Sequence, residues 1–203
     1  MSRLTVGLVD YGVGNLTSVT HALHDAGFRV RLAGDSTVLD ACDVLLLPGV
    51  GAFPSAMRKL RETGLDVYLR DAAKTNRPLL GICLGMQLLA EESFEMGHSR
   101  GLGILPGRVI PLRDTPWHIG WNSLECTVPD SAFQNSHGQY FYFNHSFALN
   151  GASEHVAAVA HVPGTVTAAV RRGRIAGLQF HPEKSQHAGT SLLRALILEI
   201  AHA

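Results

Sequence analysis

The sequence predicts an α/β fold: a mostly parallel sheet with helices on both faces and an antiparallel extension. Residues 44–47 and 78–82 are uninterrupted apolar runs, typical of central strands that are covered on both faces. In the first half of the chain such strands alternate with glycine-rich loops and helical periodicity, which is the pattern of a parallel sheet. From Gly101 onward the segments are shorter and rich in Val, Tyr and Phe, which favours antiparallel strands.

The first half follows a strand, loop and helix order. We expect strands at 4–9, 28–32, 44–47 and 78–82. We expect helices at 16–26, 54–75 and 83–92. Glycine-rich turns at 12–15 and 49–51 separate the first and third of these strands from the segments that follow them.

The second half adds only short strands and one final helix. The strands are expected at 108–112, 121–127, 139–144, 155–162, 165–171 and 174–180, and the helix at 189–201. No linker rich in Pro or Ser separates the two halves, so we expect residues 1–203 to form a single domain. A chain of 203 residues with 46% hydrophobic content is long enough for one well-buried core.

Charge and cysteine content argue against several classes of protein. Lys plus Arg and Asp plus Glu number 17 each, so the formal net charge is zero and nucleic acid is not expected as a ligand. The three cysteines include no C-x-x-C pair, which argues against a disulfide framework or zinc site and favours a reducing compartment. No apolar run approaches the ~20 residues of a membrane span, so we expect a soluble, cytoplasmic protein.

Residues 81–85 (G-I-C-L-G) have the pattern of a nucleophile elbow, in which a strand turns abruptly into a helix and exposes one side chain. The glycines relieve crowding in the turn, and a helix N-terminus favours the thiolate form of Cys83. The backbone N–H of Leu84 is placed to stabilise a developing oxyanion. A buried structural cysteine at a strand end is the alternative, which both glycines and the strand-to-helix switch disfavour.

Residues 179–183 (Q-F-H-P-E) supply the base and the orienting group that a thiolate nucleophile requires. His181 and Glu183 are two residues apart, so their side chains project to the same side of an extended segment. Pro182 biases His181 toward that extended backbone. A plain turn is the alternative for an isolated His-Pro-Glu, but together with the elbow the segment predicts a triad of Cys83, His181 and Glu183.

The loop at 48–53 offers backbone N–H groups with little side-chain bulk, suitable as a second oxyanion donor. A phosphate-binding loop is the competing interpretation. The segment lacks the Lys-Ser/Thr of a Walker A motif and a full G-x-G-x-x-G. Gln87 follows Cys83 by four residues and is therefore expected on the same helix face, near the elbow.

Three of these segments closely resemble the signature segments of the class I, or triad-type, glutamine amidotransferases: 48–53, 81–87 (G-I-C-L-G-M-Q) and 179–185 (Q-F-H-P-E-K-S). Within that family, four further segments resemble the glutaminase subunits of imidazole glycerol phosphate synthase, an enzyme of histidine biosynthesis: 10–15, 101–107, 118–122 and 142–147. The matches span nearly the whole chain in the right order.

The resemblance implies a flavodoxin-like α/β sheet and a reaction in which L-glutamine forms a thioester on Cys83 and is hydrolysed to glutamate and ammonia. It also implies that the ammonia passes to a separate cyclase subunit with a (β/α)8 barrel, within a heterodimer. Only unprotonated ammonia is a nucleophile, so it has to be kept from bulk water. The chemistry requires no metal and no organic cofactor.

The resemblance further implies a role for each residue that matches a family motif. His181 is the general base and acid, and Glu183 orients it. The oxyanion hole is formed by Val50, Gly51 and Leu84. The glutamine is held by Gly49, Gly51, Gln87, Glu95, Asn144, His145, Ser146 and Phe147, with Glu95 a candidate partner for the substrate ammonium. The cyclase subunit is contacted by Asn15, Trp121, Tyr142 and Lys184.

Asn144 departs from the pattern of these subunits, which usually have an aliphatic residue before the His-Ser pair. An Asn at this position resembles the carbamoyl phosphate synthetase branch of the family, in which it contacts glutamine. Asn144 either alters the affinity for glutamine or only forms a local hydrogen bond.

Three alternative functions stay open. The first is a paralogous glutaminase that serves another ammonia-using synthase, for example in surface sugar amidination, and it is motivated by Asn144 and the unusual helix start at 17–19. The second is a catalytically silent binding module, which the presence of both Cys83 and His181 disfavours. The third is a peptidase that shares the fold and acts on short peptides.

Overall fold

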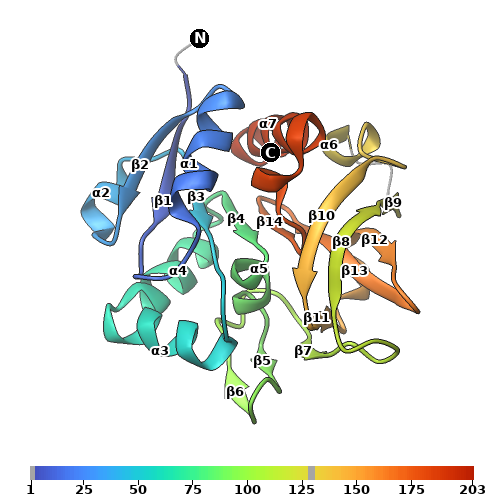
Figure 1. The fold of residues 1–203 in the computed structure, drawn as a ribbon. Helices are drawn as coiled ribbons and strands as arrows, with labels where there is room; N and C mark the ends of the chain where they lie inside the picture. The colour runs from blue at the N-terminus through green and yellow to red at the C-terminus, as the bar shows by residue number, and fades with distance from the viewer. Residues whose placement is uncertain (1–2, 128–130) are drawn as a thin grey trace.

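The computed structural model describes residues 3–127 and 131–203, and its centre is an eight-stranded sheet (Figure 1). Across the sheet the strands are β2 (Arg29–Ala33), β1 (Thr5–Val9), β3 (Val44–Leu47), β4 (Leu79–Ile82), β14 (Ile175–Leu178), β13 (Thr165–Arg172), β12 (Val156–His161) and β9 (Glu125–Cys126). Neighbours from β2 to β14 pair in parallel, and those from β14 to β9 pair antiparallel. The predicted α/β sheet with an antiparallel extension is confirmed, and the order of its parallel part is the flavodoxin-like one.

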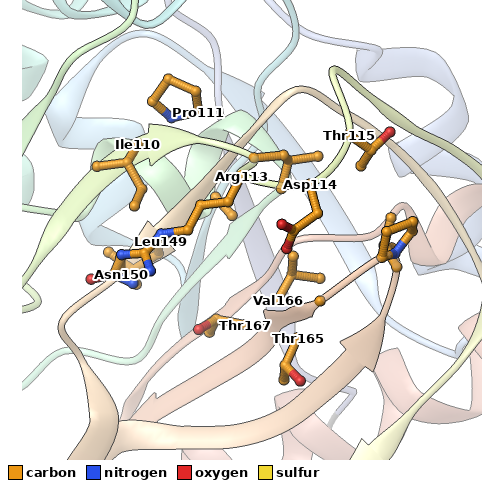
Figure 2. Close-up of a pocket in the computed structure, with 15 residues that line it drawn as sticks. Ile110, Pro111, Arg113, Asp114, Thr115, Leu149, Asn150, Thr165, Val166 and Thr167 are labelled. Atoms are coloured by element: carbon orange, nitrogen blue, oxygen red, sulfur yellow. The ribbon is translucent and has the colours of Figure 1, made fainter.

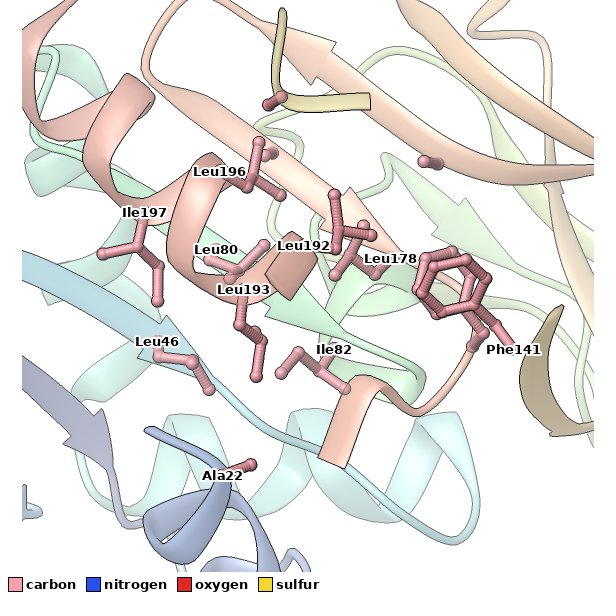
Figure 3. Packing of buried hydrophobic residues seen from close by; sticks show 14 of the residues in the cluster. Ala22, Leu46, Leu80, Ile82, Phe141, Leu178, Leu192, Leu193, Leu196 and Ile197 are labelled. Carbon is pink, nitrogen blue, oxygen red and sulfur yellow. The ribbon is translucent and has the colours of Figure 1, made fainter. Parts of the chain in front are cut away.

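Apolar clusters lie on both faces of this sheet because side chains alternate along each strand. Leu46 packs on one face with α1 (Leu16–Asp25) and α7 (Gln186–His202), as Figure 3 shows for Leu193 and Ile197. Leu45 and Leu47 pack on the other face with α3 (Phe53–Glu62) and α4 (Leu65–Lys74). The uninterrupted apolar run at 44–47 is therefore explained by burial on both sides.

Two smaller sheets extend the fold beside the carboxyl ends of the parallel strands. An antiparallel ribbon pairs β8 (His118–Ser123) with β10 (Tyr140–His145). The second small sheet has the order β11 (Phe147–Asn150), β7 (Arg108–Pro111), β5 (Glu92–Ser93) and β6 (Ser99–Arg100). The described chain also contains α2 (Ser36–Asp40), α5 (Leu84–Leu88), α6 (Ser131–Gln134) and the 3₁₀ turns η1 (Ser153–His155) and η2 (Pro182–Lys184).

Several predicted boundaries were wrong. The helix expected at 54–75 is two helices, because Gly64 between them has a left-handed φ of 74°. The helix expected to reach residue 92 ends at Leu88, since the backbone beyond it bonds to the β7 region through Glu91 N–H to Gly107 O and Phe94 N–H to Val109 O. The strand expected at 121–127 is divided between β8 and β9, and α7 begins three residues before the predicted start.

The described helices are too short or too polar to cross a membrane. This finding covers residues 3–127 and 131–203.

Candidate active site

The turn between β4 and α5 holds Cys83 in a strained conformation, with φ 53° and ψ −114°. Glycine is required on both sides of it for steric reasons. A Cβ at Gly85 would lie 1.9 Å from the carbonyl oxygen of Leu47, and one at Gly81 would lie 2.7 Å from Gly85 O. The elbow thus depends on close backbone packing between the end of β3, the turn and the first residues of α5.

His181 lies beside Cys83, at the point where the chain leaves β14 and enters η2. Its Nδ1 is 2.7 Å from Glu183 Oε1, and its side chain lines the same cavity as Cys83. Its backbone N–H donates to Tyr142 O at 2.8 Å, which ties the segment to β10. The structure therefore brings together the three predicted triad residues, although 98 positions separate Cys83 from His181.

The electrostatic environment of His181 favours its protonated form. Burial alone would lower the pKa of His181, but hydrogen bonds to Cys83 and Glu183, together with their negative charges, outweigh burial and raise it to about 10. The Glu183 side chain is only 1% exposed, and its Oε2 is buried with no hydrogen-bond partner among the described residues. The Glu183 carboxylate is thus balanced mainly by His181.

A cavity of about 270 Å³ opens above the elbow. It is lined by Val50, Gly51, Cys83, Leu84, Gln87, Glu95, Asn144, His145, Ser146, Phe147, His181 and Lys184. Of the residues predicted for catalysis, the oxyanion hole or substrate binding, two do not line it. Gly49 is buried below the loop, where a Cβ would lie 2.8 Å from Leu84 Cβ, and Glu183 lies behind His181.

Gln87 is held inside the protein by two hydrogen bonds. Its Nε2 donates to Phe147 O at 2.8 Å and to Gln179 Oε1 at 3.0 Å. Gln179 is fully buried, and its own amide nitrogen lies 4.0 Å from Cys83 Sγ. The role of Gln179 was missed in the sequence, although a polar residue directly after the apolar strand Ile175–Leu178 was a usable signal.

The loop at 48–53 is fixed at both ends by side chains. The Tyr11 hydroxyl, buried below the sheet edge, donates to Pro48 O at 3.0 Å. At the other end Phe53 N–H donates to Glu95 Oε2 at 2.7 Å, so that Glu95 caps α3 while it also lines the cavity. Gly51 between them has a left-handed φ of 87°, which glycine adopts without strain.

Of the four residues predicted to contact a cyclase subunit, three form one aromatic and basic surface. Trp121 and Tyr142 are cross-strand neighbours with ring centroids 6.1 Å apart, and Lys184 Nζ lies 5.6 Å from the Tyr142 ring centroid. Ile119 and Tyr140 extend this surface along the outer face of the ribbon, where they are 59% and 60% exposed. Asn15, the fourth residue, occupies the N-cap position of α1, which packs beside η2.

A second cavity of about 240 Å³ lies between β7, β11 and the turn that joins β12 to β13 (Figure 2). Ile110, Leu149 and Val166 contribute apolar side chains to it, and Arg113 and Asp114 contribute charged ones. None of the three triad residues lines this cavity. The candidate active site is therefore the cavity above the elbow.

Cys42 and Cys83 are free thiols. Within residues 3–127 and 131–203 no group of three or more His, Cys, Asp or Glu side chains is arranged to hold a metal ion.

Comparisons with known proteins agree with the geometry. A family model described as "Glutamine amidotransferase class-I" matches residues 7–200. The imidazole glycerol phosphate synthase subunit HisH of Carboxydothermus hydrogenoformans is 43% identical over 192 residues, which cover 93% of this chain and 96% of that protein. The HisH subunit of Geobacillus kaustophilus is 43% identical over 197 residues, 93% of each chain.

Solved structures show the same fold at low sequence identity. The structure of PurLQS from Thermotoga maritima contains a chain with a TM-score of 0.77 and 20% identity, covering 97% of this chain and 98% of that one. A glutamine amidotransferase from the same organism has a TM-score of 0.71 and 14% identity, covering 100% of both chains. The match of the family model and the high identity of the HisH relatives show that the chain belongs to the class-I glutamine amidotransferase family.

Proposed function

We propose that this chain is the glutaminase subunit of an imidazole glycerol phosphate synthase, which releases ammonia from L-glutamine for histidine biosynthesis. The observation that carries the proposal is the arrangement of Cys83, His181 and Glu183 at the base of a cavity large enough for an amino acid. The HisH relatives support the pathway, because they match over more than nine tenths of the chain.

Acylation begins when Cys83 Sγ attacks the side-chain amide carbon of glutamine. His181 takes the thiol proton and then donates it to the departing nitrogen, so that ammonia leaves and a thioester remains. The raised pKa of His181 suits this step because the imidazolium is the acid that the leaving group needs. The oxyanion is stabilised by Leu84 N–H and by the loop at Val50 and Gly51, where each donor is worth roughly 10²-fold or more in rate.

Deacylation uses the same catalytic groups, with water as the nucleophile and Cys83 as the leaving group. His181 accepts a proton from water as the water oxygen attacks the thioester carbon. The C–S bond then breaks to release glutamate, and His181 returns the proton to Cys83 Sγ, which regenerates the thiol. Glu183 holds the imidazole in the Nδ1–H tautomer during both steps. Glu95, Asn144, Ser146 and Phe147 line the cavity where the rest of the glutamine is held.

We propose the outer face of the ribbon as the docking surface for the cyclase subunit. Trp121 and Tyr142 lie on this face, and Lys184, which extends from η2 over the Tyr142 ring, also lines the cavity. Aromatic residues such as Trp121 and Tyr142 are enriched in interface cores, and the charged Lys184 would lie at the polar rim. A partner seated there, a (β/α)8 barrel in the proposed heterodimer, would cover the route by which ammonia leaves.

The proposal is tested by measuring glutamate produced from glutamine, by the wild type and Cys83→Ala, each alone and with the candidate cyclase plus its nucleotide ligand. Turnover that requires the partner and is lost in Cys83→Ala supports the proposal. Turnover indifferent to that partner favours a paralogous glutaminase, for which Asn144 at the cavity is the motivating observation. Inactivity under all conditions would indicate a silent binding module.

We infer further that residues 1–203 form one domain, because strands from both halves share the eight-stranded sheet. The free thiols of Cys42 and of Cys83, the proposed nucleophile, fit a reducing cytoplasm.

A further inference from the structure

The inner face of the ribbon carries a buried pair of histidines. His118 and His145 are direct cross-strand partners and each is 7% exposed. His118 Nδ1 lies 3.0 Å from His145 Nε2, and His118 stacks on Phe143 with ring centroids 4.3 Å apart. His118 neither lines the cavity nor belongs to the triad, so the proposed reaction does not by itself account for its burial.

The proton positions on both rings follow from the groups at the two ends of this pair. His145 Nδ1 is 2.8 Å from Phe147 O, which can only accept, so His145 Nδ1 carries a proton. In a neutral ring His145 Nε2 is then an acceptor, which makes His118 Nδ1 the donor between the two rings.

Asn122 lies at the other end of the histidine pair, and its hydrogen bonds give the same direction of donation. Its Oδ1 accepts from Ser123 N–H at 2.8 Å, and its Nδ2 donates to His161 O at 2.8 Å, so the orientation of the amide is determined. The same Nδ2 lies 3.3 Å from His118 Nε2, which is the acceptor nitrogen of a neutral ring. Donors therefore run in one direction from Asn122 through His118 and His145 to the Phe147 carbonyl.

This chain of hydrogen bonds ends on the wall of the cavity. Phe147 O accepts from both His145 Nδ1 and Gln87 Nε2, so one carbonyl joins the ribbon to α5. Asn144, His145, Ser146 and Phe147 together line the cavity. Burial lowers the pKa of both His118 and His145 to about 4, so both rings are neutral near pH 7, as the directions of the bonds require.

We propose that His118 is a positioning residue, which fixes the tautomer of His145 and thereby holds the wall at 144–147 in the shape that receives glutamine. The inference rests on the proposed glutaminase function. His118 acts only through His145, so its loss should impair capture of the substrate and leave the reactivity of Cys83 itself unchanged.

Substrate capture and the reactivity of Cys83 are distinguished by measuring the second-order rate of Cys83 alkylation with each of two reagents. A glutamine-mimicking diazo-ketone has to occupy the cavity, whereas iodoacetamide reports only the thiol and its base. His118→Phe keeps a ring for stacking on Phe143 but loses the donor to His145. His118→Asn loses the ring but places an amide N–H near the position of His118 Nδ1.

We expect His118→Phe to react with the diazo-ketone about tenfold or more slowly, the effect of losing one buried hydrogen bond, and with iodoacetamide at the wild-type rate. His118→Asn should recover most of the diazo-ketone rate. The same substitution at an exposed histidine, His24→Phe, should change neither rate. Wild-type rates in His118→Phe, or a parallel fall with both reagents in both His118 variants, would overturn the proposal.

A spectroscopic measurement tests the proposal even if His118→Phe fails to fold. In ¹⁵N-histidine-labelled wild type near neutral pH, His118 and His145 should both appear as neutral Nδ1–H tautomers, and His118→Asn should retain that signal for His145. Nε2–H tautomers in the wild type contradict the proposal. Wild-type Cys83 that does not react with the diazo-ketone would instead contradict the glutaminase function, independently of any His118 variant.

Discussion

The two sides of the cavity are built in different ways. The elbow around Cys83 consists of neighbouring residues held by backbone contact, so that Gly81 and Gly85 have no room for a single extra carbon. The opposite wall at 144–147 is held by side-chain hydrogen bonds that come from β8, β10 and α5. A substitution in the elbow should therefore abolish folding or activity, whereas a substitution that removes one hydrogen bond from the wall should cause only a partial loss.

The largest effect is expected from removing the nucleophile at the elbow. Cys83→Ala should reduce glutaminase activity to background, a fall on the order of 10⁴-fold or more, because no thioester can form. Cys42→Ala, which removes another buried thiol, should retain activity. The assay is glutamate release in the presence of the partner subunit. Residual thiol-independent turnover in Cys83→Ala would contradict the proposed chemistry.

The next largest effect concerns the steric basis of the elbow. Gly85→Ala places a carbon 1.9 Å from Leu47 O, so we expect a loss of about 4 kcal/mol or more in unfolding free energy, or failure to fold. Gly64→Ala is the matched control, because its Cβ meets nothing within 4 Å and only the left-handed φ is strained. That variant should lose only about 1 kcal/mol in urea unfolding. Equal losses would show that crowding does not define the elbow.

The same contrast explains how much the sequence could predict. The elbow and the His-Pro-Glu segment were located because each is a short run of consecutive residues with a local physical reason. The wall at 144–147 could be placed only through family resemblance, since His118 is linked to Phe147 only through His145, by the pairing of β8 with β10 and the turn after it. The early end of α5 was missed for a related reason: the backbone after Leu88 is bonded to a distant segment.

Replacing the charge behind His181 tests whether the triad depends on electrostatics as well as geometry. Glu183→Gln can still accept from His181 Nδ1–H but removes the charge that helps to raise the pKa of His181, so kcat should fall on the order of 10²-fold or more. Glu125→Gln changes an exposed His–Glu pair, with His161 Nε2 at 2.8 Å, and should leave kcat unchanged. A Glu183→Gln enzyme with wild-type kcat would assign Glu183 a purely structural role.

The wall should make the free energy of unfolding depend on pH. His118 and His145 have folded-state pKa values of about 4, below the usual 6.5, so their contribution is present above pH 6.5 and is lost as the pH falls toward 4. His181 acts in the opposite sense: its contribution is complete below pH 6.5 and is lost as the pH rises toward 10.

Urea unfolding between pH 7 and 5 measures the acid side of this dependence. Each histidine contributes a slope of up to about 1.4 kcal/mol per pH unit. His118→Phe removes one of these titrations while the carboxylates stay the same, so its stability should fall less steeply than that of the wild type. Identical slopes for the two proteins would mean that His118 is not held neutral by folding.

The smallest effect is expected at the Tyr11 hydroxyl, which joins the first strand to the oxyanion loop. Tyr11→Phe removes the donor to the buried Pro48 carbonyl, and the loss should be about 1–2 kcal/mol in urea unfolding. The exposed Tyr140 provides the control, since Tyr140→Phe should cost less than about 0.5 kcal/mol. The loop at 48–53 lies between the elbow, which is held by backbone packing, and the wall, which is held by side-chain hydrogen bonds. The activity of Tyr11→Phe tests which of these two kinds of contact holds the loop in place. A few-fold fall in kcat with an unchanged KM would mean that side-chain bonds tune the oxyanion loop, as they do the wall. Unchanged kcat would mean that packing of Gly49 against Leu84 is sufficient to hold it.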